Sequence, residues 1–324
     1  MFDEGADVQA RKDPETAALF RRLAKLPAER RFFRVLDDAH AAAYAEAGDT
    51  LVVTFERTES ILATGEAPMP LGHWLSDTFG WSFLTILVTG STWARSDAVY
   101  ALFDDLIDRG LFDGFERVLF YGAGTQAHAA CAFAVAAPGA DVIAISPQAT
   151  LSPDRAGFDH RFGPARRMDF TSRYGYAPAM LEAAGTVHIL YDPRIDEDAA
   201  HAAQFNAPHI RLHRLRHFGE NPEQMLAQME ALPRIFELWD DGRLDTGTLA
   251  RVLRARRGSR SYLMRLFDQT QEAEKTLRGA ILCNFAWREL GAPRFRRRRD
   301  ELLDELRADG IPVPAALEDG PEDA

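Results

Sequence analysis

Residues 117–147 read RVLFYGAGTQAHAACAFAVAAPGADVIAISP, and the order of the elements that they predict indicates the fold class. RVLFYG (117–122) is an apolar run of strand length, and DVIAISP (141–147) is a second one. Between them lie a Gly-rich turn and QAHAACAFAVAAPG (126–139), whose small residues suit a helix packed closely on a sheet. Strand, turn, helix and strand in this order predict two parallel strands joined by a helical crossover.

The same alternation continues on both sides of this stretch. Residues 92–110 have helical spacing, with Ser96 or Asp97 as the N-cap and Gly110 as the stop. Apolar strands alternating with amphipathic helices predict an α/β domain over residues 47–235, built on a doubly wound, mostly parallel sheet. The other strand-like runs are LVVTFE (51–56), FLTILVTG (83–90), TVHILYDP (186–193) and HIRLHRL (209–215).

Three further segments flank the predicted α/β domain. Residues 1–46 are expected to supply N-terminal helices packed on it, because 14–46 are rich in helix formers with a Leu-Pro break near residue 26. Residues 243–309 show only helical periodicity and predict an all-helical C-terminal extension. Residues 310–324 are acidic and Pro-rich, so we expect a disordered tail there.

Composition limits the class of protein. A chain of 324 residues with 46% hydrophobic residues can bury a large core, and no run is long and apolar enough to span a membrane. The acidic, polar N-terminus does not resemble a signal peptide, so a cytoplasmic location is expected. Cys131 and Cys283 lie in helix-like stretches and are expected to be buried hydrophobes, which leaves no disulfide framework and predicts no metal site.

Charge is unevenly distributed along the chain. The formal net charge is -11, but residues 243–299 hold fifteen Lys and Arg against five Asp and Glu, so this segment is +10 and the remainder is -21. A net acidic protein is not expected to bind nucleic acid or anionic membrane as a whole. The basic helical region instead predicts self-association, intramolecular docking or an acidic protein or glycan partner, with nucleic acid less favoured because aromatic residues are sparse there. The candidate arginines for an anionic partner are Arg254, Arg256, Arg257, Arg296, Arg297 and Arg298.

The turn at residues 122–126 admits three interpretations. It has the setting of the nucleophile elbow G-x-S-x-G, in which a tight strand-to-helix turn lifts a serine above the sheet, but Gly124 stands at the nucleophile position. It also matches the dinucleotide pattern G-x-G-x-x-A from Gly122 to Ala127, although the following strand ends in Ser146 rather than a ribose-binding carboxylate. A third interpretation is a tight connection that binds nothing.

Residues downstream of the elbow favour the hydrolase interpretation. Asp192 and His217 follow two later strand-like runs, in the chain order nucleophile, acid, histidine that hydrolases of this type use. Alternative acids are Asp196 and Glu197, and the alternative histidine is His213. Thr125 carries a hydroxyl next to the elbow, and a His oriented by a carboxylate could activate water, so hydrolysis without a serine remains an alternative.

FYGAGTQAHAACAFAVAAPGADVIAISPQATL (120–151) resembles a group of α/β-hydrolase-like bacterial proteins with the motif FYG-x-S-M-G-G-Y-A-A…PGA-x-V-x-A-x-SPQ. It is still more similar to a subgroup with YGAG-x-x-x-Y-A-A, and the likeness extends to RYGYAP (173–178), LYDP (190–193) and PRFRRR (293–298). The resemblance implies a hydrolase scaffold with Gly124 at the nucleophile position, Asp192 near the acid and His217 near the histidine. Gln126 and His128 replace the Gly and Tyr of the motif.

Members of that subgroup often carry the label phosphoadenosine phosphosulfate reductase. Such chemistry needs an SGG-x-DS-like phosphate loop and a reactive C-terminal cysteine. This chain has no such loop, and Cys283 lies within the apolar run AILCNFAW.

The favoured hypothesis is therefore a catalytically inactive α/β-hydrolase-fold protein with a binding or assembly role. Gly122, Thr125, Gln126 and His128 are its candidate binding residues, no cofactor is expected, and a protein partner or a second copy would use the basic helices. The alternatives are a hydrolase with a non-serine mechanism at the degenerate triad and a nucleotide-binding reductase.

Overall fold

The structure is a computed structural model that describes residues 13–65 and 67–318, and it divides the chain into two compact units, Met1–Leu215 and Arg216–Ala324. The division falls earlier than the predicted end of the α/β domain at residue 235. Residues 216–235 belong to the helical unit because they form helices and no strand.

The first unit is built on one eight-stranded sheet with the order β1-β2-β4-β3-β5-β6-β7-β8. The β1–β2 and β2–β4 pairs are antiparallel, and all the other pairs are parallel. This confirms the predicted α/β class with a doubly wound, mostly parallel sheet. The strands are β1 Arg31–Val35, β2 His40–Ala45, β3 Thr50–Arg57, β4 Ser82–Val88, β5 Arg117–Ala123, β6 Asp141–Ile145, β7 Val187–Tyr191 and β8 Ile210–Arg214.

The prediction of helices throughout residues 14–46 was wrong for its second half. Helix α1 (Pro14–Ala24) forms as expected, with the Asp13 carboxylate accepting a hydrogen bond from Thr16 N at 2.9 Å. Residues 31–45 instead form the antiparallel hairpin β1–β2, and β2 is buried along its whole length between β1 and β4. Its sequence HAAAYA favours a helix by local propensity, but burial between two strands outweighs a preference of a few tenths of a kcal/mol per residue.

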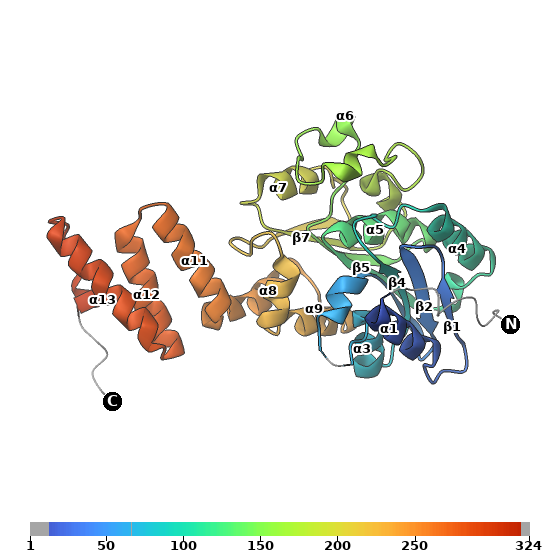
Figure 1. Ribbon diagram of the computed structural model, residues 1–324, viewed down its shortest axis with the longest axis horizontal. Coiled ribbons are helices and arrows are strands. Elements are labelled where there is room, and N and C mark those ends of the chain that lie inside the picture. Colours follow the sequence, from blue (N-terminus) through green and yellow to red (C-terminus); the bar gives the residue numbers. More distant parts are fainter. Residues whose placement is uncertain (1–12, 66, 319–324) are drawn as a thin grey trace. The chain divides into compact units, whose positions relative to one another are not determined.

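Helices cover both faces of the sheet (Figure 1). On one face, Phe103 of α4 and Phe133 of α5 lie with ring centroids 4.4 Å apart, and both stack against Phe55 of β3. On the other face α3 packs so closely that a Cβ on its Gly72 would lie 2.4 Å from Thr85 Oγ1. The helices and 3-10 turns of this unit after α1 are α2 Thr58–Leu62, α3 Leu71–Phe79, α4 Asp97–Asp108, η2 Phe112–Gly114, α5 Thr125–Phe133, η3 Ala134–Ala136, α6 Pro153–Ala156, η4 Pro164–Arg167, η5 Ala177–Leu181 and α7 Asp196–Ala202.

The second unit is helical, as the periodicity of residues 243–309 predicts. Leu302, Leu303 and Leu306 of α13 are buried, as are Ala280 and Cys283 of α12. Residues 315–318 of the predicted disordered tail form the short helix α14, and residues 319–324 lie outside the described ranges. The elements are α8 Pro222–Gln228, α9 Ala231–Asp240, α10 Thr246–Val252, η6 Leu253–Gly258, α11 Arg260–Glu272, α12 Thr276–Leu290, α13 Pro293–Ala308 and α14 Ala315–Glu318.

Two expectations from composition can be compared with the structure. Cys131 and Cys283 are both buried and unpaired, as predicted. Within residues 13–65 and 67–318, none of the helices is long and apolar enough to cross a membrane.

Candidate functional site

The turn between β5 and α5 has the backbone of a nucleophile elbow. Gly124 adopts φ 58° and ψ -125°, and its N–H donates to Ile145 O on β6 at 2.8 Å. A Cβ on Gly122 would lie 2.4 Å from Gln126 O, so close packing of the helix requires glycine at position 122. A Cβ on Gly124 would meet no atom within 4 Å, so the space above the elbow would accept a side chain.

The first turn of α5 lies beside this space. Thr125 is partly exposed, and its Oγ1 donates to Gln126 Oε1 at 2.6 Å. Gln126 is buried, and its Nε2 has no hydrogen-bond partner in the part of the chain that the structure describes. Because the N-cap residue Gly124 has no side chain, it cannot cap the first amides of the helix as a serine or aspartate would.

His128, the remaining candidate binding residue, does not face the elbow space. Its ring is buried, with Nδ1 2.8 Å from Gln148 O and Nε2 3.1 Å from Tyr174 O. Burial lowers the pKa of His128 to about 4, so the ring is neutral at neutral pH. A neutral ring has one N–H, so His128 donates to one of these carbonyls and only contacts the other, which ties α5 to the segment between β6 and β7. Its predicted role in ligand binding stays a prediction.

Ser146, directly after β6, is held in an unusual conformation beside the elbow. Its φ is 51°, a left-handed value that costs a non-glycine residue about 1 to 3 kcal/mol. Two backbone hydrogen bonds hold it there, from Ser146 N to Leu190 O at 2.8 Å and from Gln148 Nε2 to Ser146 O at 3.0 Å. Its Oγ is buried and has no hydrogen-bond partner among the described residues.

An ionic cluster lies next to Ser146, in which Asp159, Asp198 and His201 are buried and Arg161 reaches the surface. Arg161 bridges two carboxylates, with NH2 2.8 Å from Asp159 Oδ2 and NH1 2.8 Å from Asp198 Oδ1. His201 Nε2 lies 3.0 Å from Asp159 Oδ2, and its Nδ1 accepts from Ala149 N at 3.2 Å. The backbone donor at Nδ1 requires an unprotonated nitrogen there, so Nε2 carries the proton that His201 donates to Asp159.

The two carboxylates of this cluster have opposite pKa shifts. Burial acts to raise the pKa of Asp159, but hydrogen bonds from His201 and Arg161 outweigh it and hold the pKa well below its usual range. For Asp198 burial dominates and raises the pKa, although Arg161 opposes it. Asp198 Oδ2 has no hydrogen-bond partner among the described residues.

Sequence reasoning missed this cluster, although two signals were available. Ser146 opens the SPQ triplet that carries part of the family resemblance, and Asp198 ends the acidic run Asp196-Glu197-Asp198. Asp196 is exposed and Glu197 half-buried, whereas Asp198 is buried. Burial of one acidic residue in a run of three is a tertiary property that the run itself does not reveal.

Asp192 lies where the sequence predicts it, directly after β7. It is buried, and its Oδ1 accepts from Arg194 N at 3.0 Å, which closes a turn into α7. The strands β5 and β7 are separated by β6, so Asp192 and Gly124 stand about 10 Å apart across the sheet at two strand spacings.

His217 belongs to the second unit, near its start. It has φ 69°, and its Nδ1 lies 2.5 Å from Gln269 Oε1 on α11. A carboxamide oxygen is only an acceptor, so Nδ1 of His217 carries the proton in this contact.

Comparisons with known proteins bear on the fold alone. No family model matches the sequence, and no curated protein matches it. Similar solved structures include a Pyrobaculum calidifontis esterase, with 14% identity, a TM-score of 0.37 and coverage of 67% of this chain and 85% of that chain. Est1E from Butyrivibrio proteoclasticus (12% identity, TM-score 0.36, coverage 57% and 88%) and an alpha-beta serine hydrolase homologue from Coxiella burnetii (11% identity, TM-score 0.36, coverage 59% and 88%) are similar too.

Because these identities and TM-scores are low, the fold is identified from the strand order, the antiparallel second strand and the elbow after β5. The first unit has the α/β-hydrolase fold. In this fold the residue at the elbow is the nucleophile, and the acid and the histidine follow later in the chain.

Gly124 supplies no nucleophile at the elbow of the first unit. Within the second unit, His217 Nδ1 contacts the neutral amide of Gln269, and a neutral amide does not stabilise a charged histidine as a carboxylate does. The alternative histidine, His213, is buried in β8 with its Nε2 2.9 Å from His188 Nδ1. It is therefore a structural residue of the sheet.

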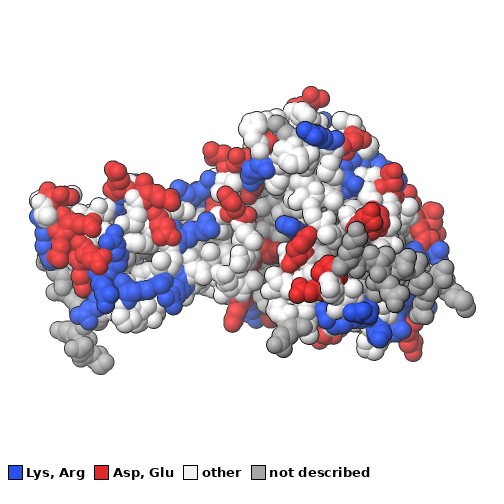
Figure 2. Space-filling model, viewed as in Figure 1, with Lys and Arg blue, Asp and Glu red and all other residues white. Residues whose placement is uncertain are grey.

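The candidate arginines of the second unit differ in their surroundings. Arg254, Arg257 and Arg297 are exposed, and the guanidinium of Arg296 lies 5.2 Å from the ring centroid of Trp287. Arg298 is held within the unit by Glu301 and Gln271, each at 2.8 Å. The half-buried Arg256 donates to Leu253 O at 2.8 Å. In Figure 2, Lys and Arg side chains are interspersed with Asp and Glu side chains over α11 to α13.

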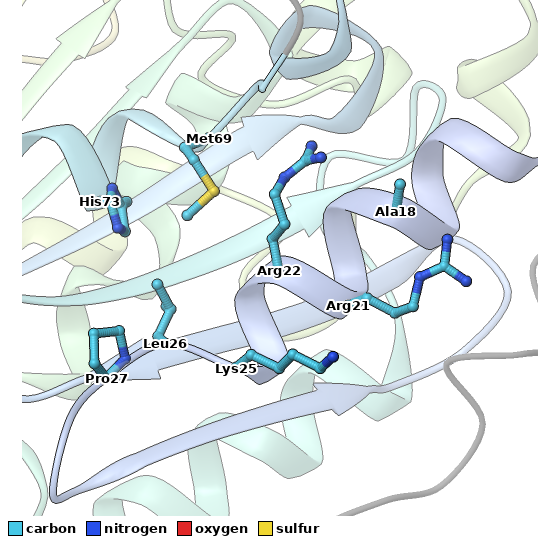
Figure 3. Close-up of a pocket in the computed structure, with 8 residues that line it drawn as sticks. All are labelled: Ala18, Arg21, Arg22, Lys25, Leu26, Pro27, Met69 and His73. Atoms are coloured by element: carbon cyan, nitrogen blue, oxygen red, sulfur yellow. The ribbon is translucent and has the colours of Figure 1, made fainter.

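A separate depression of about 560 Å³ lies against α1, away from the β5–α5 junction (Figure 3). Arg21, Arg22 and Lys25 of α1 make it basic, and Arg22 NH2 donates to Pro68 O at 3.1 Å. Over the described ranges there is no group of three or more His, Cys, Asp or Glu that could hold a metal ion. The other lining residues are Ala18, Leu26, Pro27, Met69 and His73.

Proposed function

We propose that this chain is a catalytically inactive α/β-hydrolase-fold protein whose elbow binds a ligand rather than attacking a substrate. The observation that carries the proposal is Gly124, which has the elbow backbone with φ 58° and ψ -125° but no side chain. Covalent hydrolysis needs a side-chain nucleophile at this point, and loss of the nucleophile removes nearly all of the rate advantage of a triad.

The other predicted catalytic residues do not replace the missing serine. Thr125 begins the helix one residue later, and its hydroxyl already donates to Gln126. The His217 ring is oriented by Gln269, whose neutral amide does not stabilise an imidazolium as a carboxylate does. A water-based mechanism would need that stabilisation, because the histidine would act as the general base.

Several features favour binding at the same place. Ala123, Gly124 and Thr125 are partly exposed, and the space above Gly124 is open. The first backbone amides of α5 point toward this space at the positive end of the helix, where no N-cap side chain covers them. The resemblance to the YGAG subgroup agrees with a scaffold that keeps the elbow and lacks the serine.

The cysteine chemistry does not favour the reductase label. A reactive cysteine is exposed enough to attack and has a lowered pKa. Burial raises the pKa of Cys131 far above its usual range and that of Cys283 to about 12, so both remain neutral thiols.

Ester hydrolysis tests the proposal directly. We expect wild-type protein to show no turnover of short-chain p-nitrophenyl esters above the rate of heat-denatured protein. Wild-type turnover that disappears in His217→Ala would refute the proposal, because it would show a working histidine. Gly124→Ser adds a second measurement. If Gly124→Ser hydrolyses the ester, the missing serine alone explains the inactivity of the wild type. If it does not, the contact of His217 with Gln269 contributes to the inactivity too.

The assembly part of the proposal concerns the second unit. Exposed Ile281 and Phe285 lie on α12, and exposed Arg254 and Arg257 lie on η6. We propose that this unit contacts an acidic protein partner or a second copy. Sedimentation velocity of Arg254→Glu/Arg257→Glu, with Arg57→Glu of the first unit as control, tests self-association. A wild-type monomer at all concentrations would leave only the partner hypothesis.

A further inference from the structure

Three buried polar atoms near the elbow lack hydrogen-bond partners within the described residues: Gln126 Nε2, Ser146 Oγ and Asp198 Oδ2. Their residues are only 2%, 4% and 3% exposed. Buried polar groups are almost always hydrogen-bonded, because leaving one unpaired forfeits its interaction with water. Three such atoms in one region need an explanation.

These three residues come from adjacent positions at one edge of the sheet. Gln126 follows β5, Ser146 follows β6, and Asp198 lies on α7 after β7. The bonds from Gly124 N to Ile145 O and from Ser146 N to Leu190 O fasten the ends of the three strands side by side. The carboxyl ends of three neighbouring parallel strands span about 10 Å, the width of a small organic group with its hydrogen-bonding shell.

Ser146 lies close enough to Asp198 to affect the pKa of its carboxyl. Ser146 acts on the Asp198 carboxyl as a hydrogen-bonding neighbour does, in the direction that lowers its pKa. The two side chains do not reach the distance and angle of a formed hydrogen bond, however. Both atoms thus retain their capacity for a third group.

All three side chains are held in place. Arg161 fixes Asp198 through Oδ1, Thr125 fixes Gln126 through Oε1, and Ser146 is fixed by the bonds at its own N and O. Ser146 also keeps a left-handed φ of 51°. Backbone strain of this kind persists where the surroundings enforce it, and it concentrates at binding and catalytic sites.

We propose that Gln126, Ser146 and Asp198 form a binding subsite for a neutral group that has both a hydrogen-bond donor and an acceptor, namely a primary amide or a hydroxyl. The carboxylate oxygen needs a donor, the Gln126 NH₂ needs an acceptor, and the Ser146 hydroxyl can serve as either. An anion would be repelled by Asp198. A free cation would find a carboxylate already paired with Arg161.

Glycine at position 124 suits this subsite. We place the way in above Gly124, where a Cβ would meet no atom within 4 Å. The inference rests on the proposed binding function, since an active nucleophile at the elbow would use the same space. It adds the chemistry of the ligand and the residues that select it.

Acetamide is a probe with the required donor and acceptor, and N,N-dimethylacetamide is its matched control because it lacks N–H donors. We expect acetamide to shift the backbone amide resonances of Ser146 and Asp198 saturably in a titration followed by heteronuclear NMR. Dimethylacetamide is expected to give no saturable shift. Equal responses to both probes, or a linear response to acetamide, would overturn the proposal.

Two serine variants separate binding from stability. Ser146→Ala removes an unpartnered hydroxyl, so we expect an unchanged or higher urea midpoint and acetamide binding weakened by about tenfold, the value of one good hydrogen bond. Ser82→Ala removes a buried hydroxyl that accepts from Ala47 N and donates to Gly48 O, both at 2.8 Å. This control is expected to lose stability and keep acetamide binding.

Acetamide affinity unchanged in Ser146→Ala would refute the subsite. A structure of the soaked protein with water alone between Ser146 Oγ and Asp198 Oδ2 would refute it too. Failure of the proposed function has a different signature, because it appears as wild-type ester turnover that depends on His217.

Discussion

The buried pair His188 and His213 predicts a loss of stability in mildly acidic solution. The two residues lie on neighbouring strands β7 and β8, are 2% and 4% exposed, and join Nδ1 to Nε2 at 2.9 Å. One nitrogen donates and the other accepts, so protonation of the acceptor breaks the bond and leaves a buried charge. Burial accordingly lowers the pKa of each ring to about 4.

The sign and size of the effect follow from proton linkage. An unfolded histidine has a pKa near 6.5, so below that pH the two histidines bind protons in the unfolded chain but not in the native protein. The stability of the protein therefore falls as the pH falls. Between about pH 7.5 and 5.5 each ring lowers the free energy of unfolding by about 1.3 kcal/mol. The pair together lowers it by about 2.5 kcal/mol if the rings titrate independently. The loss continues until the pH passes below the native pKa of about 4. A total stability of about 5 to 15 kcal/mol makes such a change easy to measure.

Urea unfolding at the two pH values, with hydrogen exchange of peptides from β7 and β8 to report on the first unit, measures the effect. The matched variant is His188→Leu/His213→Leu, which replaces the pair with side chains of similar volume and no titratable group. We expect wild type to lose about 2.5 kcal/mol more than the double variant over this pH range. Equal pH dependence in the two proteins would refute the depressed pKa values.

Three glycine substitutions test the close contacts described above. Gly122→Ala places a Cβ 2.4 Å from Gln126 O and is expected to lower the free energy of unfolding by about 1 to 3 kcal/mol or more, measured by urea unfolding. Gly72→Ala meets Thr85 Oγ1 at 2.4 Å, and a similar loss is expected, reduced only if that side chain rotates away. Gly124→Ser meets no atom within 4 Å, so its expected cost is the backbone term alone, about 1 to 3 kcal/mol for a positive φ. A Gly122→Ala protein as stable as wild type would show that the elbow is not as tight as described.

The parallel strands could be predicted from sequence because each is buried on both faces. A strand such as SFLTILV or VHILY has apolar residues at nearly every position, and such runs are short and bounded by polar turns. The hairpin β1–β2 could not be predicted in this way. HAAAYA has the composition of a helix, and only its pairing with β4, about 40 residues later in the chain, makes it a strand.

The residues of the candidate site that come directly after a strand could be predicted from the sequence. Gly124 and Asp192 are found there, as expected from the order of motifs along the chain. Each of His128, Ser146 and Asp198 has a partner that is distant in sequence: Tyr174 for His128, Leu190 for Ser146 and Arg161 for Asp198. No local pattern contains such contacts, so the polar environment of the elbow had to come from the structure.

The contacts of His128 with two backbone carbonyls have a consequence for the rate of ligand exchange. Gln148 and Tyr174 lie toward the two ends of the segment that joins β6 to β7, and Ala177 N adds a bond to Ala149 O at 2.9 Å. The backbone at Gln148 and Tyr174 cannot move away from α5 without moving that helix. Lid opening on the microsecond to millisecond scale limits turnover in many enzymes. Positions 148 and 174 are therefore not the moving part of such a lid, so any opening that admits a ligand to the buried Gln126, Ser146 and Asp198 comes from other residues.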